Sequence, residues 1–440
     1  MPSIQEILLA IRSTKLADFD AWRGRFVVWT AAATAGFIVV LFARATEYAN
    51  ALFFTLQKTH WWLPLILTPV AGMLIVWITR RWFVGAAGSG IPQTIAALHM
   101  SDSPHSTLVS LKLAFGKVML GIGALAAGFS AGREGPSVQV GASIMHAFRR
   151  FLPAGFSVNP RHLILAGGAA GISAAFNTPL AGIVFAIEEL GRRFEQKTNG
   201  VVITAIVLSG LVSISLQGNY TYFGQLAVGI IDKKIIIPVI VCGLVCGVLG
   251  GIFSRTLIES SDSFTGRVGK FRSLHPLWWA GFCGLIVALL GAISAGSAHG
   301  SGYLFTREML GGEVAETWQY APIKYLATIF TYLSGVPGGI FAPSLAIGAG
   351  IGNDLLPLFG NLHSNTAIYA LCMAGFLAAV TQAPLTSFII VMEMIDGHEM
   401  VTSLMAVAMI ASIISKIFSK PLYATLAEAQ MSRISAIKYK

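Results

Sequence analysis

Long apolar stretches, separated by short segments rich in glycine and basic residues, dominate the pattern of hydrophobic and polar positions along this chain. Most of them approach the roughly 20 residues that a helix needs to cross the hydrocarbon core of a bilayer. The pattern therefore predicts a helical protein that crosses a membrane many times, with apolar stretches near 26–43, 61–79, 108–128, 163–187, 201–216, 235–254, 276–295, 321–334, 366–392 and 401–418.

Composition agrees with this pattern, since 55% of the residues are hydrophobic, 11% are charged and the mean hydropathy is +0.72. An ordinary soluble protein, in which about a quarter of the residues are charged, is excluded. The net charge of +10 comes from basic clusters between the apolar stretches, which we expect on the cytoplasmic side. Because these clusters are dispersed and do not alternate with aromatic residues, no nucleic-acid partner is expected. They are Arg80/Arg81, Arg149/Arg150/Arg161, Arg192/Arg193/Lys197, Arg267/Lys270/Arg272 and Lys416/Lys420/Arg433/Lys438/Lys440.

The N-terminus and the cysteines suggest no separate chemistry. Residues 1–25 lack a clean apolar core and a small-residue cleavage site, so we expect a cytoplasmic amphipathic helix rather than a cleaved signal peptide. The cysteines all lie in apolar stretches without histidine or carboxylate neighbours, as buried packing residues do. They are Cys242, Cys246, Cys283 and Cys372. We expect no metal and no cofactor.

Two halves of the chain resemble each other. "GPSVQVGA" (135–142) matches "APSLAIGA" (342–349) at an offset of 207, and "GISAAFNTPLAGIVFAIEEL" (171–190) matches "GFLAAVTQAPLTSFIIVMEM" (375–394), with one residue inserted, at an offset of 205. "GSGIP" (88–92) pairs with "GSGYL" (300–304) at an offset of 212, which also pairs Lys112 with Lys324. Basic residues precede the first GSG and acidic residues follow the second, so we expect the two repeats to be inverted, as in many transporters.

Glycines interrupt the matched helices at three places, 88–90, 132–135 and 338–339. Pro136 and Pro343 then stand where a new helix begins, a position that tolerates a missing N–H. The start of a half-helix exposes unpaired amides and a partial positive charge, which in a bilayer favour an anion. If the three breaks converge near the midplane, they form a cradle for a small anion.

Glu134 lies within the second break, in "GREGP" (132–136). An ionised carboxylate there can occupy the anion position, and a protonated one can leave it, which would couple the anion to a proton. In the alternative interpretation, Glu134 only pairs with Arg133 or caps the helix.

With these motifs, the sequence resembles the CLC family of chloride channels and chloride/proton antiporters. "GSGIP" (88–92), "GREGP" (132–136), "GGIFAP" (338–343) and "KPLY" (420–423) occur in the order and spacing of that family, and the likeness extends from about residue 20 to 425. The resemblance implies an all-α, polytopic membrane protein with two inverted repeats of tilted and broken helices. It also implies a homodimer with one pore in each subunit.

The resemblance further implies roles for single residues. Ser89 and Tyr423 are expected to donate hydroxyls to a central anion, and Glu134 to be the outer gate. Backbone amides of the two half-helix starts are expected to form the outer cradle, at Arg133, Glu134, Gly135, Ile340, Phe341 and Ala342. Taken alone, Ser89 also fits a helix cap and Tyr423 a membrane-interface residue.

An inner proton-transfer glutamate, which the family's antiporters carry, is expected at Glu189. Glu188 matches Glu393 of the second repeat, whereas Glu189 matches Met394, so Glu188 and Glu393 are interpreted as a structural pair. Glu189 could instead pair with Arg192 or Arg193 at a helix end. "QTIAAL" (93–98) lacks the acids that antiporters often have there, which favours a passive chloride channel as the second hypothesis.

Parts of the sequence also fit two other classes of protein. "GFSAG" (128–132) fits the GxSxG pattern of serine hydrolases, and Ser130 with His299 or His146 would then form an intramembrane protease. A membrane scaffold explains the small residues of "GLVCGVLGG" (243–251) and "GIGALAAG" (121–128) by helix packing, but it leaves Glu134 unexplained.

The sequence and its resemblance to the CLC family therefore predict a transporter rather than an enzyme, which exchanges chloride for protons across a bilayer. We expect a bacterial cytoplasmic membrane, with the membrane of an organelle as the alternative. We expect a first repeat at 26–217, a linker at 218–232, a second repeat at 233–420 and a C-terminal helix and tail at 421–440. A cytoplasmic regulatory domain after Tyr423 is not expected.

Overall fold

The computed structural model describes residues 19–100, 108–154, 158–191, 199–218, 221–224, 235–261, 267–312, 318–360 and 365–438. Within these ranges the chain is helical, and its single β-type pairing is an isolated bridge between Gly132 and Gly339. The all-α prediction is thus confirmed. The main helices are α2 (Phe19–Thr59), α3 (Leu63–Trp82), α4 (Ile91–His99), α6 (Leu111–Ala126), α7 (Glu134–Ala147), α8 (Pro160–Phe176), α9 (Pro179–Phe185), α10 (Asn199–Gln217), α11 (Ile236–Ser261), α12 (Arg267–Leu274), α13 (Pro276–Ile293), α14 (Tyr303–Leu310), α15 (Tyr320–Ser334), α16 (Phe341–Phe359), α17 (Asn365–Thr381), α18 (Pro384–Ile395), α19 (Val401–Phe418) and α20 (Leu422–Lys438).

Six of the described helices are long and apolar enough to cross a membrane: α2, α3, α10, α11, α13 and α19. Two other apolar stretches of the sequence are each divided between two shorter helices. The stretch at 163–187 is broken where Asn177 takes a left-handed conformation (φ 58°), and Pro179 starts α9. The stretch at 366–392 is broken in the same way, at Gln382 (φ 58°) and Pro384. Proline cannot continue the preceding helix but suits the first turn of a new one.

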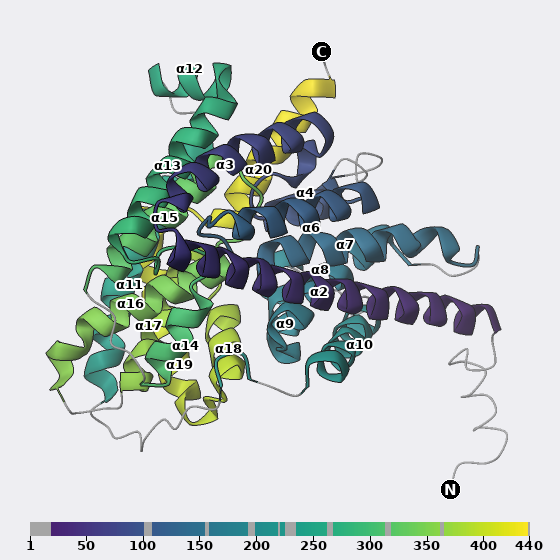
Figure 1. Cartoon of the computed structure of the whole chain (residues 1–440). Helices are drawn as coiled ribbons and strands as arrows, with labels where there is room; N and C mark the ends of the chain where they lie inside the picture. The colour runs from purple at the N-terminus through teal and green to yellow at the C-terminus, as the bar shows by residue number, and fades with distance from the viewer. Residues whose placement is uncertain are drawn as a thin grey trace, which may run out of the picture.

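The packing scheme of the first half recurs in the second (Figure 1). Helix α7 packs on α8 as α16 packs on α17, and α8 packs on α10 as α17 packs on α19. Helix α2 packs on α10 as α11 packs on α19, while α20 returns from the second half to contact α4. The internal repeat seen in the sequence is therefore a repeat of helix packing as well.

Two contacts between the halves are reciprocal. Gly132 and Gly339 each donate their amide to the other's carbonyl, both over 2.7 Å. The Glu188 carboxylate accepts the amides of Leu385 and Thr386 at the start of α18, and the Glu393 carboxylate accepts those of Leu180 and Ala181 at the start of α9. Contacts in which two equivalent residues exchange the same bond indicate a local two-fold axis. Glu188 and Glu393 are thus the structural pair that the repeat predicted.

Small residues pack the helices closely, as expected for "GLVCGVLGG". A side chain on Gly243 or Gly247 of α11 would collide with Ile410 or Ile414 of α19, at 2.8 and 2.7 Å. Gly121 of α6 packs likewise against Phe42. All four cysteines are free and buried, as predicted.

One pairing predicted from the repeat is wrong. Lys112 is exposed, and Lys117 is the residue of the first half that corresponds to Lys324. Lys117 is buried and its ammonium group donates to the carbonyls of Ala86 and Gly88. Lys324 is equally buried and donates to three carbonyls of the second GSG loop, those of Ala298, His299 and Gly300. Each lysine thus holds the loop that precedes a helix break.

Parts of the predicted domain scheme lie outside the described residues. Residues 1–18 of the N-terminal segment do, and residues 19–25 are the first turns of α2. Within the linker at 218–232, the described residues 221–224 include Tyr222 and Phe223, which are buried.

We expect Glu188→Ala and Glu393→Ala to destabilise the protein to a similar degree, by about 1–3 kcal/mol each, because each leaves two amides of a helix start without their charged acceptor. Thermal unfolding in detergent would measure the effect. Glu259→Ala is the control, because Glu259 is exposed and its side chain pairs with Arg255 four residues away. Unchanged unfolding of both capping variants would contradict the structural role.

Candidate anion and proton site

Three helix breaks meet inside the molecule, as the glycine pattern predicted. The bridge between Gly132 and Gly339 joins the breaks before α7 and α16. The amide of Gly338 donates to the carbonyl of Gly88 over 3.1 Å, which adds the break before α4. Three segments that lie far apart in the sequence therefore bring half-helix starts together.

The residues predicted to form the outer cradle lie at the starts of α7 and α16. Helix α7 begins at Glu134 and α16 at Phe341, and each has a proline as its third residue. The first amides of a helix have no partner within it, and neither start has a side-chain cap. The predicted cradle residues at these two starts, all buried, are Arg133, Glu134, Gly135, Ile340, Phe341 and Ala342.

Glu134 turns its carboxylate back toward this cradle. The side chain is fully buried, and its carboxylate lies beside the backbone amides of Arg133, Ala342 and Glu134 itself. Neither carboxylate oxygen completes a hydrogen bond with a described residue. A side chain on Gly132 would collide with the carboxylate, so the glycine makes room for it. Glu134 thus sits among the amides without a fixed partner.

Arg133 is held by groups other than Glu134. Its Nη1 donates to Glu47 Oε1 over 2.7 Å and to the carbonyl of Ala43 over 2.6 Å. Its guanidinium also lies over the ring of Tyr222, 5.9 Å from the ring centre. Arg133 therefore forms its ion pair with Glu47, which disfavours the alternative that Glu134 merely pairs with Arg133. The sequence analysis did not identify Glu47 or Tyr222.

Ser89 and Tyr423 lie deeper, beside the cradle. Both side chains are buried, at 2% and 1% exposure. Their hydroxyls are near each other, but neither completes a hydrogen bond within the described residues. The Tyr423 ring stacks on Phe341 with ring centres 5.9 Å apart, and a side chain on Gly135 would collide with Ser89 Oγ. Buried hydroxyls of this kind usually have a partner, so both remain candidates for contact with an anion.

Glu189 lies within a π-helical turn, η3 (Ala186–Gly191), a local feature that is frequent at functional sites. Its side chain is buried at 3% exposure, and its charge is close enough to act on Tyr423. Glu188, one residue earlier, points instead to the start of α18. Arg192 and Arg193, the predicted alternative partners of Glu189, lie outside the described residues.

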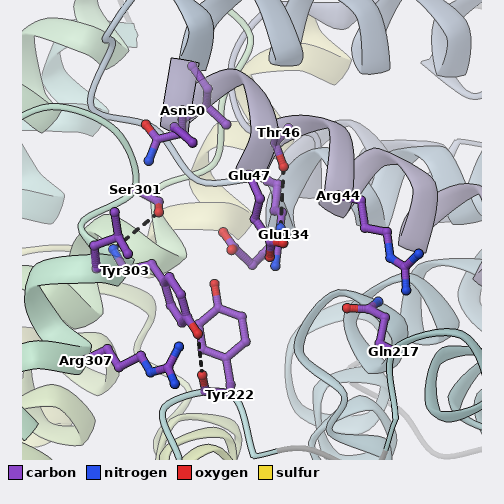
Figure 2. Close-up of a pocket in the computed structure, with 14 residues that line it drawn as sticks. Arg44, Thr46, Glu47, Asn50, Glu134, Gln217, Tyr222, Ser301, Tyr303 and Arg307 are labelled. Carbon is purple, nitrogen blue, oxygen red and sulfur yellow. Dashed lines mark hydrogen bonds and ion pairs between the residues drawn. The ribbon is translucent and has the colours of Figure 1, made fainter. Parts of the chain in front are cut away.

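An outer cavity of about 520 Å³ reaches Glu134 (Figure 2). Arginines and tyrosines from both halves of the chain surround it. Its lining includes Arg44, Glu47, Arg133, Tyr222, Tyr303 and Arg307. Arg133 and Glu134 are thus the predicted cradle residues that this cavity reaches.

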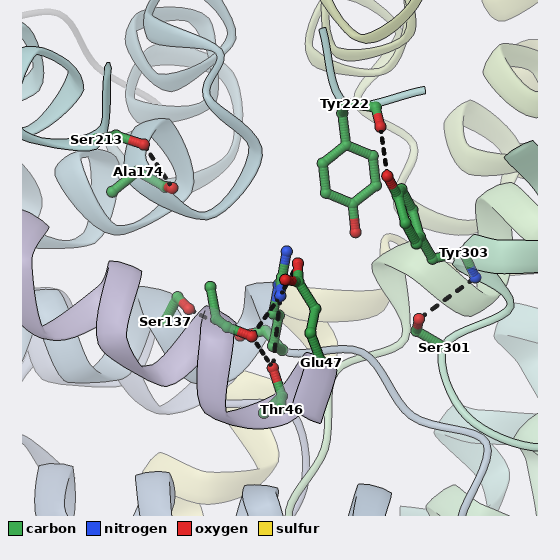
Figure 3. A network of polar contacts seen from close by, with 10 residues as sticks. Thr46, Glu47, Ser137, Ala174, Ser213, Tyr222, Ser301 and Tyr303 are labelled. Carbon is green, nitrogen blue, oxygen red and sulfur yellow. Dashed lines mark hydrogen bonds and ion pairs between the residues drawn. The ribbon is translucent and has the colours of Figure 1, made fainter. Parts of the chain in front are cut away.

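Tyr222 and Tyr303 form one wall of the outer cavity (Figure 3). The hydroxyl of Tyr303 donates to the carbonyl of Tyr222 over 3.0 Å, and the two ring centres lie 4.8 Å apart. Tyr222 also contacts Phe176, which in turn contacts Phe341. An aromatic wall thus extends from the outer cavity to the cradle.

The serine hydrolase hypothesis finds no support in the described residues. Ser130 Oγ hydrogen bonds to Thr328 Oγ1 over 2.9 Å. His299 uses Nδ1 for the carbonyl of Gly128, and His146 Nε2 contacts Arg149. A nucleophilic serine needs a base within hydrogen-bonding distance, and these contacts supply none.

Gly135→Ala tests how closely the cradle approaches Ser89. The added methyl group would occupy the space of Ser89 Oγ. We therefore expect anion flux through the predicted site to fall about tenfold or more, since a displacement of one ångström in such a site has effects of that order. Flux measurements in liposomes would show it. Gly200→Ala is the matched control, because nothing lies within 4 Å of the added atom. Equal flux in both variants would contradict this geometry.

Comparisons with known proteins identify the family of the chain. Residues 71–416 match the family described as voltage gated chloride channel. The H(+)/Cl(-) exchange transporter ClcA of Klebsiella pneumoniae subsp. pneumoniae is 32% identical, over 86% of this chain and 82% of its own length. A slow cyanobacterial Cl-/H+ antiporter has the same fold, with a TM-score of 0.81 at 23% identity, over 93% of this chain and 98% of that chain. A CLC-type fluoride/proton antiporter follows, with a TM-score of 0.76 at 22% identity, over 97% and 99% of the two chains.

The family match covers most of the chain, and the helix breaks of the sequence motifs converge in the structure as they must for a shared anion site. The protein is thus an integral membrane protein, and its chain belongs to the CLC family of chloride channels and chloride/proton antiporters.

Proposed function

We propose that this protein exchanges chloride for protons across a membrane. The observation that carries the proposal is the position of Glu134, whose carboxylate rests beside the amides of Arg133 and Ala342. These amides belong to the two helix starts that form the cradle for an anion. A carboxylate and a chloride ion would therefore compete for the same donors.

The competition couples the two ions. An ionised Glu134 occupies the cradle, and a proton that reaches it removes the charge which the amides attract. The neutral side chain then leaves and chloride takes its place. Arg133 stays where Glu47 and the Ala43 carbonyl hold it, so it does not neutralise Glu134 in place of the proton.

Ser89 and Tyr423 would hold chloride at the inner position. Neutral hydroxyls can donate to an anion without burying an unpaired cation, which would bind too tightly for fast release. Both hydroxyls lack a complete hydrogen bond among the described residues. Chloride is a substrate in this scheme, and the scheme requires no cofactor.

Glu189 would carry the proton on the inner side. It lies close enough to Tyr423 for its charge to act on the phenol, and its neighbour Glu188 is engaged in capping α18. The relative named H(+)/Cl(-) exchange transporter supports a proton path in this chain as well. Without such a path, the same cradle would serve a passive chloride channel.

We further propose that the protein is a homodimer in a bacterial cytoplasmic membrane. Apolar side chains are exposed along α10 and α19, the last long helices of the two repeats, and the capped helices α9 and α18 add to this face. The residues are Leu180, Ile203, Val207, Leu211, Leu385, Met405, Met409 and Ile413. Cross-linking in native membranes would test the dimer through cysteines placed at Val207 and Met409.

Reconstitution in liposomes tests the exchange. A chloride gradient is imposed without a proton gradient, and internal pH is recorded. Coupled exchange predicts proton movement that continues against an opposing pH gradient and reverses when the chloride gradient is reversed. Chloride flux without any proton movement would instead establish the passive channel.

A further inference from the structure

A second cavity, of about 390 Å³, opens beside Gly88, the residue before Ser89. Three arginines from distant parts of the chain line it: Arg80 at the end of α3, Arg272 in α12 and Arg433 in α20. Each belongs to a different basic cluster that the sequence places on the cytoplasmic side. The fold therefore gathers three predicted cytoplasmic charges at the inner approach to Ser89.

The cavity is strongly positive. None of its described lining residues is acidic. The hydroxyls of Thr79, Ser260, Ser273 and Ser334 already donate to backbone carbonyls, so the arginines supply the charged donors. Arg433 uses one amino group for the carbonyl of Ser261, and a guanidinium has five N–H donors in all. Burial, and to a smaller degree the like charge of Arg433, lower the pKa of Arg272. A ligand that brings negative charge would relieve this repulsion.

The donors differ in kind from those at the chloride position. Ser89 and Tyr423 offer neutral hydroxyls, which suit an ion that must leave quickly. Guanidinium groups match the planar, bidentate geometry of phosphate oxygens and hold them firmly. The cavity thus suits a phosphate group that stays bound better than a chloride ion in transit.

Helix α12 places this cavity at the membrane surface. Val268, Phe271 and Leu274 follow each other at intervals of three residues and are 50%, 46% and 71% exposed. Trp82 and Trp278, next to the two neighbouring helix ends, are also exposed. Aromatic and apolar side chains of this kind, combined with basic residues, are typical of the level of lipid headgroups. Figure 1 shows α12 at the same end of the molecule as the C-terminal end of α20.

We propose that this cavity binds the phosphate of an anionic phospholipid between Arg80, Arg272 and Arg433, with the acyl chains beside the apolar side of α12. Gly88 and Gly335 line the cavity, and no atom lies within 4 Å of the position of a side chain on either. A headgroup there would narrow the inner route to Ser89. The bound lipid would therefore slow chloride flux, and this consequence rests on the proposed transport function, whereas the binding itself does not.

Native mass spectrometry of the delipidated full chain tests the binding, with phosphatidylglycerol as the probe. We expect Arg80→Gln/Arg433→Gln to bind it at least about tenfold more weakly than the wild type, from the usual contribution of two arginines to anionic lipid binding. Arg150→Gln/Arg161→Gln is the control, because it removes two exposed arginines elsewhere and should bind as the wild type does. Equal binding in all three proteins would overturn the proposal.

Two further experiments identify the source of the phosphate and the effect of the bound lipid on chloride flux. Inorganic phosphate that displaces phosphatidylglycerol at low concentration would overturn the lipid assignment in favour of a soluble anion. In liposomes, chloride flux of the wild type should be several-fold slower with phosphatidylglycerol than in phosphatidylcholine alone, and the Arg80/Arg433 variant should lose this difference. Lipid-independent wild-type flux would overturn the effect on transport, while flux in phosphatidylcholine alone tests the proposed function separately.

Discussion

Glu134→Ala should leave chloride flux intact and abolish proton movement. The variant removes the carboxylate that lies beside the amides of Arg133 and Ala342, so chloride meets no competitor at the cradle and no group there can bind a proton. Flux should also lose its dependence on pH, because no protonation step remains. Parallel recordings of chloride and internal pH in liposomes would measure both changes.

Glu134→Gln distinguishes the effect of the charge at position 134 from the effect of the size of the side chain. Glutamine keeps the size of the side chain but cannot ionise, so it should behave as a permanently protonated Glu134 and also transport chloride without protons. Glu259→Gln is the control, because Glu259 is exposed, pairs with Arg255 and does not line this cavity, so this variant should preserve coupling. Coupled exchange in Glu134→Ala would refute the assigned gate.

Glu189→Ala should likewise stop proton movement, but for another reason. Chloride and its competitor Glu134 remain, so chloride flux should persist and still respond to outside pH. The proton has lost its buried inner carboxylate near Tyr423. The two variants thus differ in pH dependence, which distinguishes the shared gate from an inner relay.

Glu189→Gln and Glu188→Gln form the matched pair for this test. Glu188 neighbours Glu189, but its carboxylate caps the start of α18. We expect Glu188→Gln to lower thermal stability and to keep proton coupling in the folded fraction. If Glu188→Gln lost coupling and Glu189→Gln retained it, the proton path would pass through the other glutamate.

The two buried lysines have a structural role in the helix breaks. Lys117 and Lys324 each hold the carbonyls of a glycine loop just before a helix break. An ammonium group satisfies such carbonyls where no water is available. These lysines therefore support the breaks from which the half-helices start, in both halves of the chain.

The sequence by itself determined the class of protein, the internal repeat and the positions of the helix breaks. These features depend on short-range rules: an apolar stretch becomes a membrane helix, and glycine or proline ends one helix and starts the next. The breaks at 88–90, 132–135 and 338–339 do converge, and the same rules placed Glu134 at one of them.

Only the tertiary structure decided which side chains meet. Consecutive helical residues point about 100° apart, so Glu188 and Glu189 had to diverge, but only packing shows which of them faces Tyr423. The pairing of Lys112 with Lys324 failed because a constant offset was assumed across a loop, and loops accept insertions that helices do not.

Contacts between residues far apart along the chain also could not be predicted from the sequence, because they depend on how the helices pack. Arg133 pairs with Glu47, which lies 86 residues earlier, and no local pattern marks that partner. Arg80, Arg272 and Arg433 belong to three separate basic clusters, and their meeting at one cavity depends on how α3, α12 and α20 pack. The sequence determined where charge is permitted, and the fold decided where it gathers.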